Sequence, residues 1–282
     1  MYNNRARVPD HGDYFARWGK ASAAVRASQP CAVDVPYGSG NREKLDVFPA
    51  AKGSAEVARG APVLVFIHGG YWRSLDKADH SFVAPAFTAR GACVVLPNYA
   101  LCPGTPESPV TLPHIALQMA RALAWVYEHI GEHGGDPSRI TVAGHSAGGH
   151  LAAMLLACIW QRVGPQWPAN LVRNALSISG LHELDSIRRA PFLQQTLHLT
   201  PAQVRRCSPA WFPAPAQGTL YAVAGAEESP EFERQARLMV DAWGPERVPL
   251  CEQIPARNHF SVVDAFAEPS HRLHALAWQL LA

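Results

Sequence analysis

The chain has 282 residues, of which 48% are hydrophobic and 17% are charged. This composition fits a globular protein with a sizeable core and excludes a disordered chain. The formal net charge is only +2, and the 25 Lys and Arg residues are scattered rather than gathered in runs. We therefore expect neither nucleic acid nor a membrane surface as a partner.

Signals for targeting and for disulfide formation are absent from the sequence. The first 18 residues are polar and charged and lack the apolar core of a signal peptide. No stretch approaches the roughly 18 uncharged apolar residues of a membrane span, so we expect a cytoplasmic protein. The six cysteines stand singly without a C-x-x-C pair, which indicates free thiols, mostly buried, rather than disulfides or a zinc site.

Short apolar runs predict the strands. The first sixty residues combine a polar arm with a segment, 28–50, that reads as two short strands around a Gly/Asn turn. Beyond it the runs are continuous and rich in branched residues, as in strands buried on both faces of a parallel sheet. They lie at 62–67, 92–97, 139–144, 174–179, 219–225 and 248–254.

Helical patterns alternate with these runs. Apolar residues recur at three-to-four spacing, as on helices that cover a sheet, in segments 77–91, 112–131, 147–160, 231–244 and 271–282. The alternation predicts one α/β domain over residues 1–282, with a doubly wound, mostly parallel sheet and helices on both faces. The segment 181–217, rich in Pro, Arg, Gln and aromatic residues, interrupts it and predicts a small cap.

The string G-H-S-A-G-G at 144–149 follows a predicted strand and opens a predicted helix. Glycines on both sides of a G-x-S-x-G serine permit a tight, strained turn that lifts the hydroxyl above the sheet. The positive end of the following helix then lies beneath it. This placement predicts an α/β-hydrolase fold with Ser146 as the nucleophile, against the alternative of a structural glycine turn.

The string H-G-G-Y-W at 68–72 ends the first long strand. Acyl transfer passes through an oxyanion that needs fixed N–H donors, and glycines let the backbone approach the substrate. We assign the donors to the N–H groups of Gly70, Tyr71 and Ala147. We expect His68, beside Gly69, to brace this loop through a hydrogen bond.

The general base must follow the nucleophile and lie in a loop after a late strand. His259 fulfils both conditions among the 13 histidines. His129 and His133 have a spacing that suits a metal ligand pair, but glycines interrupt the stretch, and solvated histidines at a helix end are the commoner case. We expect no metal and no cofactor.

The acid that orients the histidine should leave the strand 219–225. Both Glu227 and Glu228 follow this strand. The usual position, three residues after the strand-terminal glycine, favours Glu228 and leaves Glu227 as the lesser choice.

With these residues assigned, the chain resembles the kynurenine formamidase (arylformamidase) branch of the α/β-hydrolases, which is related to the hormone-sensitive-lipase-like esterases. The matching segments include H-G-G-Y-W-x-x-x-D-K and E-S-P-E-F-x-R-Q, and they lie at 34–49, 68–84, 98–104, 134–154, 225–235 and 258–263. The resemblance implies hydrolysis of N-formyl-L-kynurenine to formate and L-kynurenine. It also implies that the triad acid, often Asp in the family, is here Glu228.

Other functions remain open at this point. A general carboxylesterase of the same branch would carry the same motifs. A non-catalytic binding protein of this fold would usually lack a triad residue, and a nucleotide-binding protein would need a different loop after the first strand. The partner is expected to be a small acyl substrate, with a homodimer left open. Trp72, Trp211 and Phe212 are candidates for an aromatic pocket, with packing in the core as the alternative.

Overall fold

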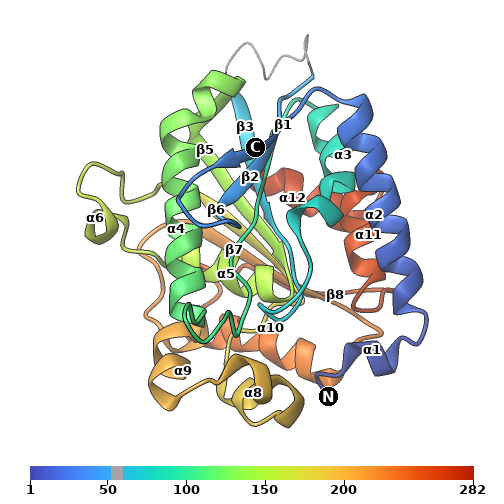
Figure 1. The fold of residues 1–282 in the computed structure, drawn as a ribbon, viewed down its shortest axis with the longest axis vertical. Coiled ribbons are helices and arrows are strands. Elements are labelled where there is room, and N and C mark those ends of the chain that lie inside the picture. The colour runs from blue at the N-terminus through green and yellow to red at the C-terminus, as the bar shows by residue number, and fades with distance from the viewer. Residues whose placement is uncertain (52–59) are drawn as a thin grey trace.

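The computed structural model describes residues 1–51 and 60–282. It contains an eight-stranded sheet in the order β1-β2-β4-β3-β5-β6-β7-β8 (Figure 1). Strands β1 and β2 run antiparallel to their neighbours, and the pairs from β4 to β8 are all parallel. The strands are β1 (Ala32–Pro36), β2 (Lys44–Phe48), β3 (Ala61–Ile67), β4 (Cys93–Pro97), β5 (Gly135–His145), β6 (Asn174–Ile178), β7 (Thr219–Gly225) and β8 (Leu250–Ile254). The predicted fold class and strands are confirmed.

Helices cover both faces of the sheet. Helices α4, α5 and α10 lie on one face, and α2, α3, α11 and α12 on the other (Figure 1). The helices are α1 (Asn4–Arg7), α2 (His11–Ser28), α3 (Ala84–Thr88), α4 (Leu112–His129), α5 (Ala147–Leu156), α6 (Trp160–Val163), α7 (Asp185–Arg188), α8 (Pro191–Leu197), α9 (Pro201–Cys207), α10 (Pro230–Trp243), α11 (Ser261–Ala267) and α12 (Arg272–Leu281). Short 3₁₀ turns add η2 (Lys77–Asp79), η3 (Ser81–Val83), η4 (Ile130–His133) and η5 (Pro209–Trp211).

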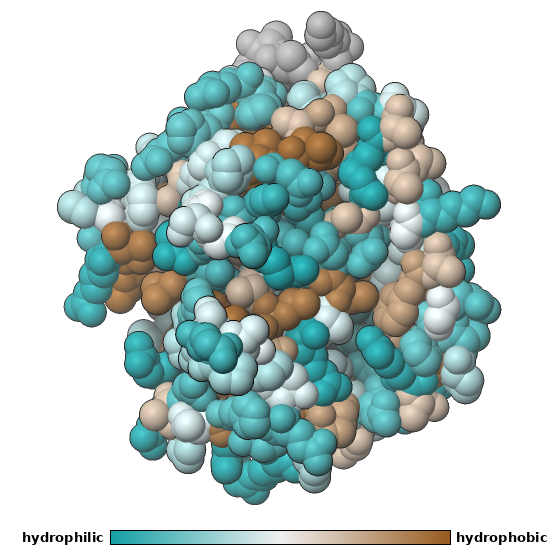
Figure 2. Space-filling view, in the orientation of Figure 1, coloured by the Kyte–Doolittle hydropathy of each residue, from teal (hydrophilic) through white to brown (hydrophobic). Residues whose placement is uncertain are grey.

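Strand β3 is apolar throughout because both of its faces are covered by helices. Val63, Val65 and Ile67 point into the core beneath α4 and α5, while Leu64 and Phe66 point into the core beneath α11 and α12. All five side chains are buried because successive side chains of a strand alternate between two covered faces. The outer surface carries mainly hydrophilic side chains on the face shown in Figure 2, with smaller hydrophobic areas between them.

Two sequence expectations were wrong. The polar arm at the start of the chain contains the 18-residue helix α2, whose buried residues are only Trp18 and Ser22. A helix with so narrow a buried stripe leaves little apolar periodicity to recognise. The segment 77–91 is not one helix but η2, η3 and the short α3 in succession, with Asp76 capping the first turn.

The register of the parallel strands brings their carboxyl ends to one edge. Ile67 of β3 lies opposite Gly144 of β5, and Ile178 of β6 lies opposite Val223 of β7. At this edge, the lower end of Figure 1, lie α1, α8, α9 and α10. Helices α8 and α9 belong to the segment 181–217. Crevices at the carboxyl ends of parallel strands are the usual ligand sites of open α/β sheets.

Helix α5 packs against the end of β3 with no side chain between the two backbones. A Cβ added at Gly148 would lie 1.9 Å from the carbonyl oxygen of Ile67. A Cβ at Gly144 would likewise lie 2.2 Å from the carbonyl oxygen of Gly148. Glycine is therefore required at both positions for the elbow to approach the sheet.

We predict that Gly148→Ala lowers the free energy of unfolding by about 3 kcal/mol or more, the upper end for a methyl group forced into a packed core. The matched control is Gly131→Ala, because a Cβ at this exposed glycine meets no atom within 4 Å. It should change stability by less than about 0.5 kcal/mol. Urea unfolding of both variants checks this, and equal stability of the two would contradict the packing argument.

Candidate active site

Ser146 occupies a strained turn between β5 and α5. Its backbone has φ 56° and ψ −115°, a conformation that non-glycine residues rarely adopt. Its N–H donates to the carbonyl oxygen of Ile178 at 2.8 Å, which fixes the turn against β6. The side chain is buried, and its Oγ makes no hydrogen bond to any described residue. The Ser146 hydroxyl is therefore free of structural hydrogen bonds within the described residues.

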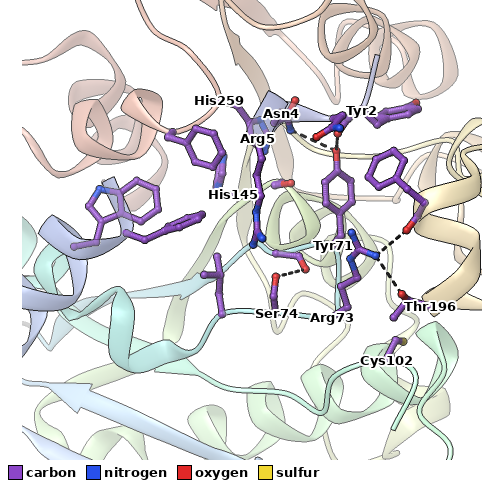
Figure 3. A pocket seen from close by; sticks show the side chains of 18 of the residues that line it. Tyr2, Asn4, Arg5, Tyr71, Arg73, Ser74, Cys102, His145, Thr196 and His259 are labelled. Carbon is purple, nitrogen blue, oxygen red and sulfur yellow. Dashed lines mark hydrogen bonds between the residues drawn. The ribbon is translucent and has the colours of Figure 1, made fainter. Parts of the chain in front are cut away.

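Ser146 lines a pocket of about 440 Å³, which is shown in Figure 3. Its walls come from the β3–η2 loop, from residues 2–5 (called the N-terminal arm below), from α2 and α8, and from the loop before α11. The lining residues are Tyr2, Asn3, Asn4, Arg5, Phe15, Trp18, Gly70, Tyr71, Arg73, Ser74, Leu75, Cys102, Pro103, His145, Ser146, Phe192, Thr196, His259 and Phe260. Ser146 and His259 therefore share one pocket that is large enough for an aromatic substrate.

His259 is held by Glu228. Its Nδ1 lies 2.6 Å from Glu228 Oε2, and the two side chains are only 6% and 1% exposed. The other carboxylate oxygen, Oε1, accepts hydrogen bonds from Ser179 Oγ at 2.5 Å and from the Gly225 N–H at 2.7 Å. An ionised carboxylate can only accept a hydrogen bond, so the ring nitrogen that faces it must carry a proton. Nδ1 of His259 therefore carries the hydrogen, and Nε2 is left as the basic atom.

The imidazole of His259 is also fixed by packing. Its ring centroid lies 4.6 Å from that of His145 and 4.6 Å from that of Phe232. Burial and the neighbouring His259 hold the pKa of His145 well below its usual range, so this second histidine is neutral. Glu227 contrasts with its neighbour, because its side chain is exposed and no side-chain hydrogen bond joins it to His259.

The loop after β3 has a left-handed backbone over three consecutive residues. Gly70, Tyr71 and Trp72 have φ values of 102°, 50° and 55°. Tyr71 and Trp72 adopt this conformation at a cost, of order 1 kcal/mol or more for each non-glycine residue, that the surrounding contacts must offset. The N–H groups of Gly70, Tyr71 and Ala147 donate to no other described residue. Such free amides beside a serine hydroxyl can stabilise an oxyanion.

His68 and its neighbours brace this loop. Its Nδ1 lies 2.8 Å from the carbonyl oxygen of Gly69, and its Nε2 lies 3.0 Å from Asn98 Oδ1. Its ring stacks on that of Tyr99 with centroids 4.3 Å apart, and the Tyr99 hydroxyl donates to the His68 and Gly69 carbonyls, at 3.0 Å each. Burial lowers the pKa of His68 to about 3, so the imidazole is uncharged in the physiological range.

None of the three aromatic residues expected in the pocket lines it. Trp72 is fully buried and packs edge-on against His150, with ring centroids 5.0 Å apart. Trp211 is 48% exposed and lies in a separate surface hollow with Met1 and Arg189. Phe212 lines a third hollow near α6. The left-handed backbone at position 72 turns the Trp72 side chain into the core rather than toward Ser146.

The N-terminal arm forms a pocket wall that the sequence did not reveal. The Tyr71 hydroxyl donates to the carbonyl oxygen of Tyr2 at 2.7 Å. The Tyr2 phenol in turn lies 2.7 Å from Ser186 Oγ, accepts from Gln235 Nε2 at 2.9 Å, and donates to Glu231. Tyr2 is buried by these contacts. Sequence reasoning also missed Ser179, for which its place directly after β6 was the available signal.

Metal-ligand geometry is absent from residues 1–51 and 60–282, where no three His, Cys, Asp or Glu side chains group to hold an ion. His129 instead contacts Glu132 Oε1, 3.2 Å from its Nδ1. The six cysteines are unbridged: three are buried, two half-buried, and Cys251 is exposed. No helix in the described residues is long and apolar enough to cross a membrane.

Comparison with known proteins identifies the relatives of this arrangement. A family model described as alpha/beta hydrolase fold matches residues 64–242. The kynurenine formamidase of Danio rerio is 29% identical over 261 residues, which cover 88% of this chain and 81% of that protein. Esterase LipQ of Mycobacterium tuberculosis is 37% identical over 123 residues, 43% of this chain and 28% of LipQ.

Solved structures have the same fold. A protein of Silicibacter sp. TM1040, provisionally described as a thioesterase, superimposes with a TM-score of 0.83 and 29% identity, covering 97% of this chain and 96% of that one. An esterase of Pyrobaculum calidifontis has a TM-score of 0.69 at 17% identity, covering 96% and 92% of the two chains. At this identity, the second likeness concerns the fold alone.

We predict that Glu228→Gln lowers kcat for an ester substrate by about 10²–10⁴, because the amide cannot hold the Nδ1–H tautomer or stabilise an imidazolium. Glu227→Gln, which removes an exposed charge one residue away, should cost less than about tenfold. Steady-state kinetics on both variants, with circular dichroism to verify folding, checks the pair. A crippled Glu227→Gln beside a fully active Glu228→Gln would reverse the assignment.

Proposed function

This chain is a hydrolase that belongs to the α/β-hydrolase fold family, and on that premise we propose that it cleaves an aryl formamide or small ester through an acyl-enzyme on Ser146. We propose N-formyl-L-kynurenine as the substrate, with formate and L-kynurenine as products. The catalytic assignment rests on the His259–Glu228 hydrogen bond of 2.6 Å beside Ser146. The substrate assignment rests on similarity to kynurenine formamidases over 88% of the chain.

The first half of the reaction is attack by Ser146 Oγ on the formyl carbonyl carbon. His259 Nε2 accepts the serine proton, and Glu228 stabilises the resulting imidazolium through Nδ1–H. The carbonyl oxygen becomes an oxyanion bound by the amides of Gly70, Tyr71 and Ala147. Collapse of this intermediate breaks the C–N bond, and the imidazolium donates its proton to the departing aryl amine.

The second half is hydrolysis of the formyl-enzyme. Water attacks the ester carbon while His259 again accepts a proton, and the same amides bind the second oxyanion. The Ser146 oxygen then leaves, takes the proton from the imidazolium, and formate is released. The carboxylate of Glu228 keeps the imidazole in one tautomer through both halves.

The dimensions and lining of the pocket support an aromatic leaving group. A formyl group adds only one carbon and one oxygen, so most of the 440 Å³ is available to the remainder of the substrate. Phe15, Trp18 and Phe260 form one wall, with ring centroids of Phe15 and Phe260 5.4 Å apart. Aromatic walls of this kind suit an aryl ring.

A general carboxylesterase is the second candidate. The similarity to esterase LipQ, although limited to 43% of the chain, is higher in identity than that to the formamidase. Comparison of kcat/KM for N-formyl-L-kynurenine with that for short p-nitrophenyl esters separates the two. A formamidase should prefer the formamide by at least about tenfold, a difference of 1.4 kcal/mol in transition-state binding. The opposite preference would favour the esterase.

We predict that Ser146→Ala lowers turnover of every substrate by about 10³-fold or more, since no other nucleophile replaces the hydroxyl. Thermal unfolding should change little, because the Oγ makes no hydrogen bond to a described residue. Activity assays and a fluorophosphonate label compare the variant with wild type. Turnover above about 1% of wild type, beyond what loss of a triad residue leaves, would reject Ser146 as the nucleophile.

A further inference from the structure

Two arginines and no carboxylates line the pocket of Ser146. The arginines are Arg5 on α1 and Arg73 in the loop after β3, and none of the lining residues is Asp or Glu. His145, the other basic side chain beside Ser146 and His259, is uncharged. The charged side chains that line the pocket directly are therefore both positive, and the carboxylate beside His259, that of Glu228, is already engaged by this histidine.

Arg73 is tied to the protein by neutral partners. Its Nη1 donates to the carbonyl oxygen of Phe192 at 2.8 Å and to Thr196 Oγ1 at 3.1 Å. Its guanidinium also lies 5.7 Å from the centroid of the Phe192 ring. No carboxylate of a described residue lies within 4 Å of it. These contacts orient the side chain while leaving its Nε and Nη2 hydrogens for another acceptor.

Arg5 approaches the same pocket from the N-terminal arm. Its guanidinium carbon lies 5.5 Å from the centroid of Phe15, and no described carboxylate pairs with it. Figure 3 shows Arg5 to the left of the Tyr71 ring and Arg73 below it. Burial, and after it the nearby charge of Arg5, lower the pKa of Arg73, as is expected for a cation that has a second cation close by.

Several arginines elsewhere in the chain are paired with a carboxylate, whereas Arg5 and Arg73 combine the lack of such a partner among the described residues with a place in the wall of this pocket. Arg121 pairs with Glu43, Arg188 with Asp185, and Arg234 with Glu231. Two guanidiniums that repel each other in a partly enclosed pocket become more favourable when an anion binds between them. Planar carboxylates match the guanidinium fork better than other common acceptors of single charge.

We propose that Arg5 and Arg73 bind a carboxylate on the leaving-group part of the substrate and so favour substrates that carry a carboxylate there over those that do not. The carboxylate belongs to the leaving group because a formyl or small acyl group has no room for one. This inference rests on the proposed function for the position of the substrate at Ser146. N-formyl-L-kynurenine is an amino-acid zwitterion that carries such a carboxylate several bonds from the formamide, next to its α-ammonium group.

The test uses an ester pair that does not depend on formamidase activity. The anionic substrate is 4-(2-acetoxyphenyl)-4-oxobutanoate, whose carboxylate stands as far from the scissile bond as that of N-formyl-L-kynurenine. The neutral substrate is its methylamide. The readout is the ratio of kcat/KM for the two esters in wild type, Arg73→Gln, Arg5→Gln, Arg73→Lys and the double glutamine variant. Arg237→Gln, which removes an exposed charge on α10, is the matched control.

We expect wild type and Arg237→Gln to prefer the anionic ester. Arg73→Gln should lower the ratio about ten- to hundredfold, as loss of a charge-assisted hydrogen bond does. Arg5→Gln should lower it less, because Arg5 is exposed, and Arg73→Lys should restore part of it. The wild-type preference should also weaken as salt is added.

Two outcomes would overturn the inference. One is a wild-type ratio near one, and the other is equal loss on both esters in the arginine variants, which would indicate that these residues only hold the loop and α8 in place. Failure of the formamidase proposal is visible separately, as poor turnover of N-formyl-L-kynurenine by an enzyme that still prefers the anionic ester.

Discussion

The candidate active site depends on one contact between two backbones. Gly148, in the first turn of α5, lies against the carbonyl oxygen of Ile67 at the end of β3, with no space for a side chain. This contact presses the loop of Gly70 and Tyr71 against the turn of Ser146. The backbone of Gly70 and Tyr71 and the side chain of Ser146 therefore line one pocket as a result of close packing between α5 and β3.

The register of the sheet adds the remaining groups. Gly225 ends β7, Ser179 follows β6, and both donate to the same oxygen of Glu228, whose other oxygen holds His259. A buried carboxylate is tolerated when several donors surround it. Consecutive strand ends supply those donors, so the orientation of the imidazole is as well defined as the sheet itself.

Local sequence was sufficient for some of the site and insufficient for the rest. Short contiguous motifs predict the turn of Ser146 and the glycine loop after β3. The number of residues after the end of β7 favoured Glu228 over Glu227. The lining of the pocket was not predictable in this way. Trp72 is adjacent to Tyr71 but its side chain points into the core, because the positive φ angle of Trp72 sets the direction in which the side chain leaves the backbone. Tyr2 and Arg5 reach the site only through tertiary contacts, and the polar helix α2 shows little periodicity.

The anchoring of Tyr2 has a consequence for the order in which the molecule is assembled. Tyr2 and Gln235 are 233 positions apart in the chain, yet their side chains are hydrogen-bonded. On a ribosome, the segment that closes the pocket emerges long before α10, which receives it. Long-range closure of this kind is slow relative to local structure. Because β8 and the loop of His259 follow α10 in the chain, the pocket wall formed by Tyr2 and the last part of the sheet are completed at a similar stage, and the cavity acquires its full lining only near the end of synthesis.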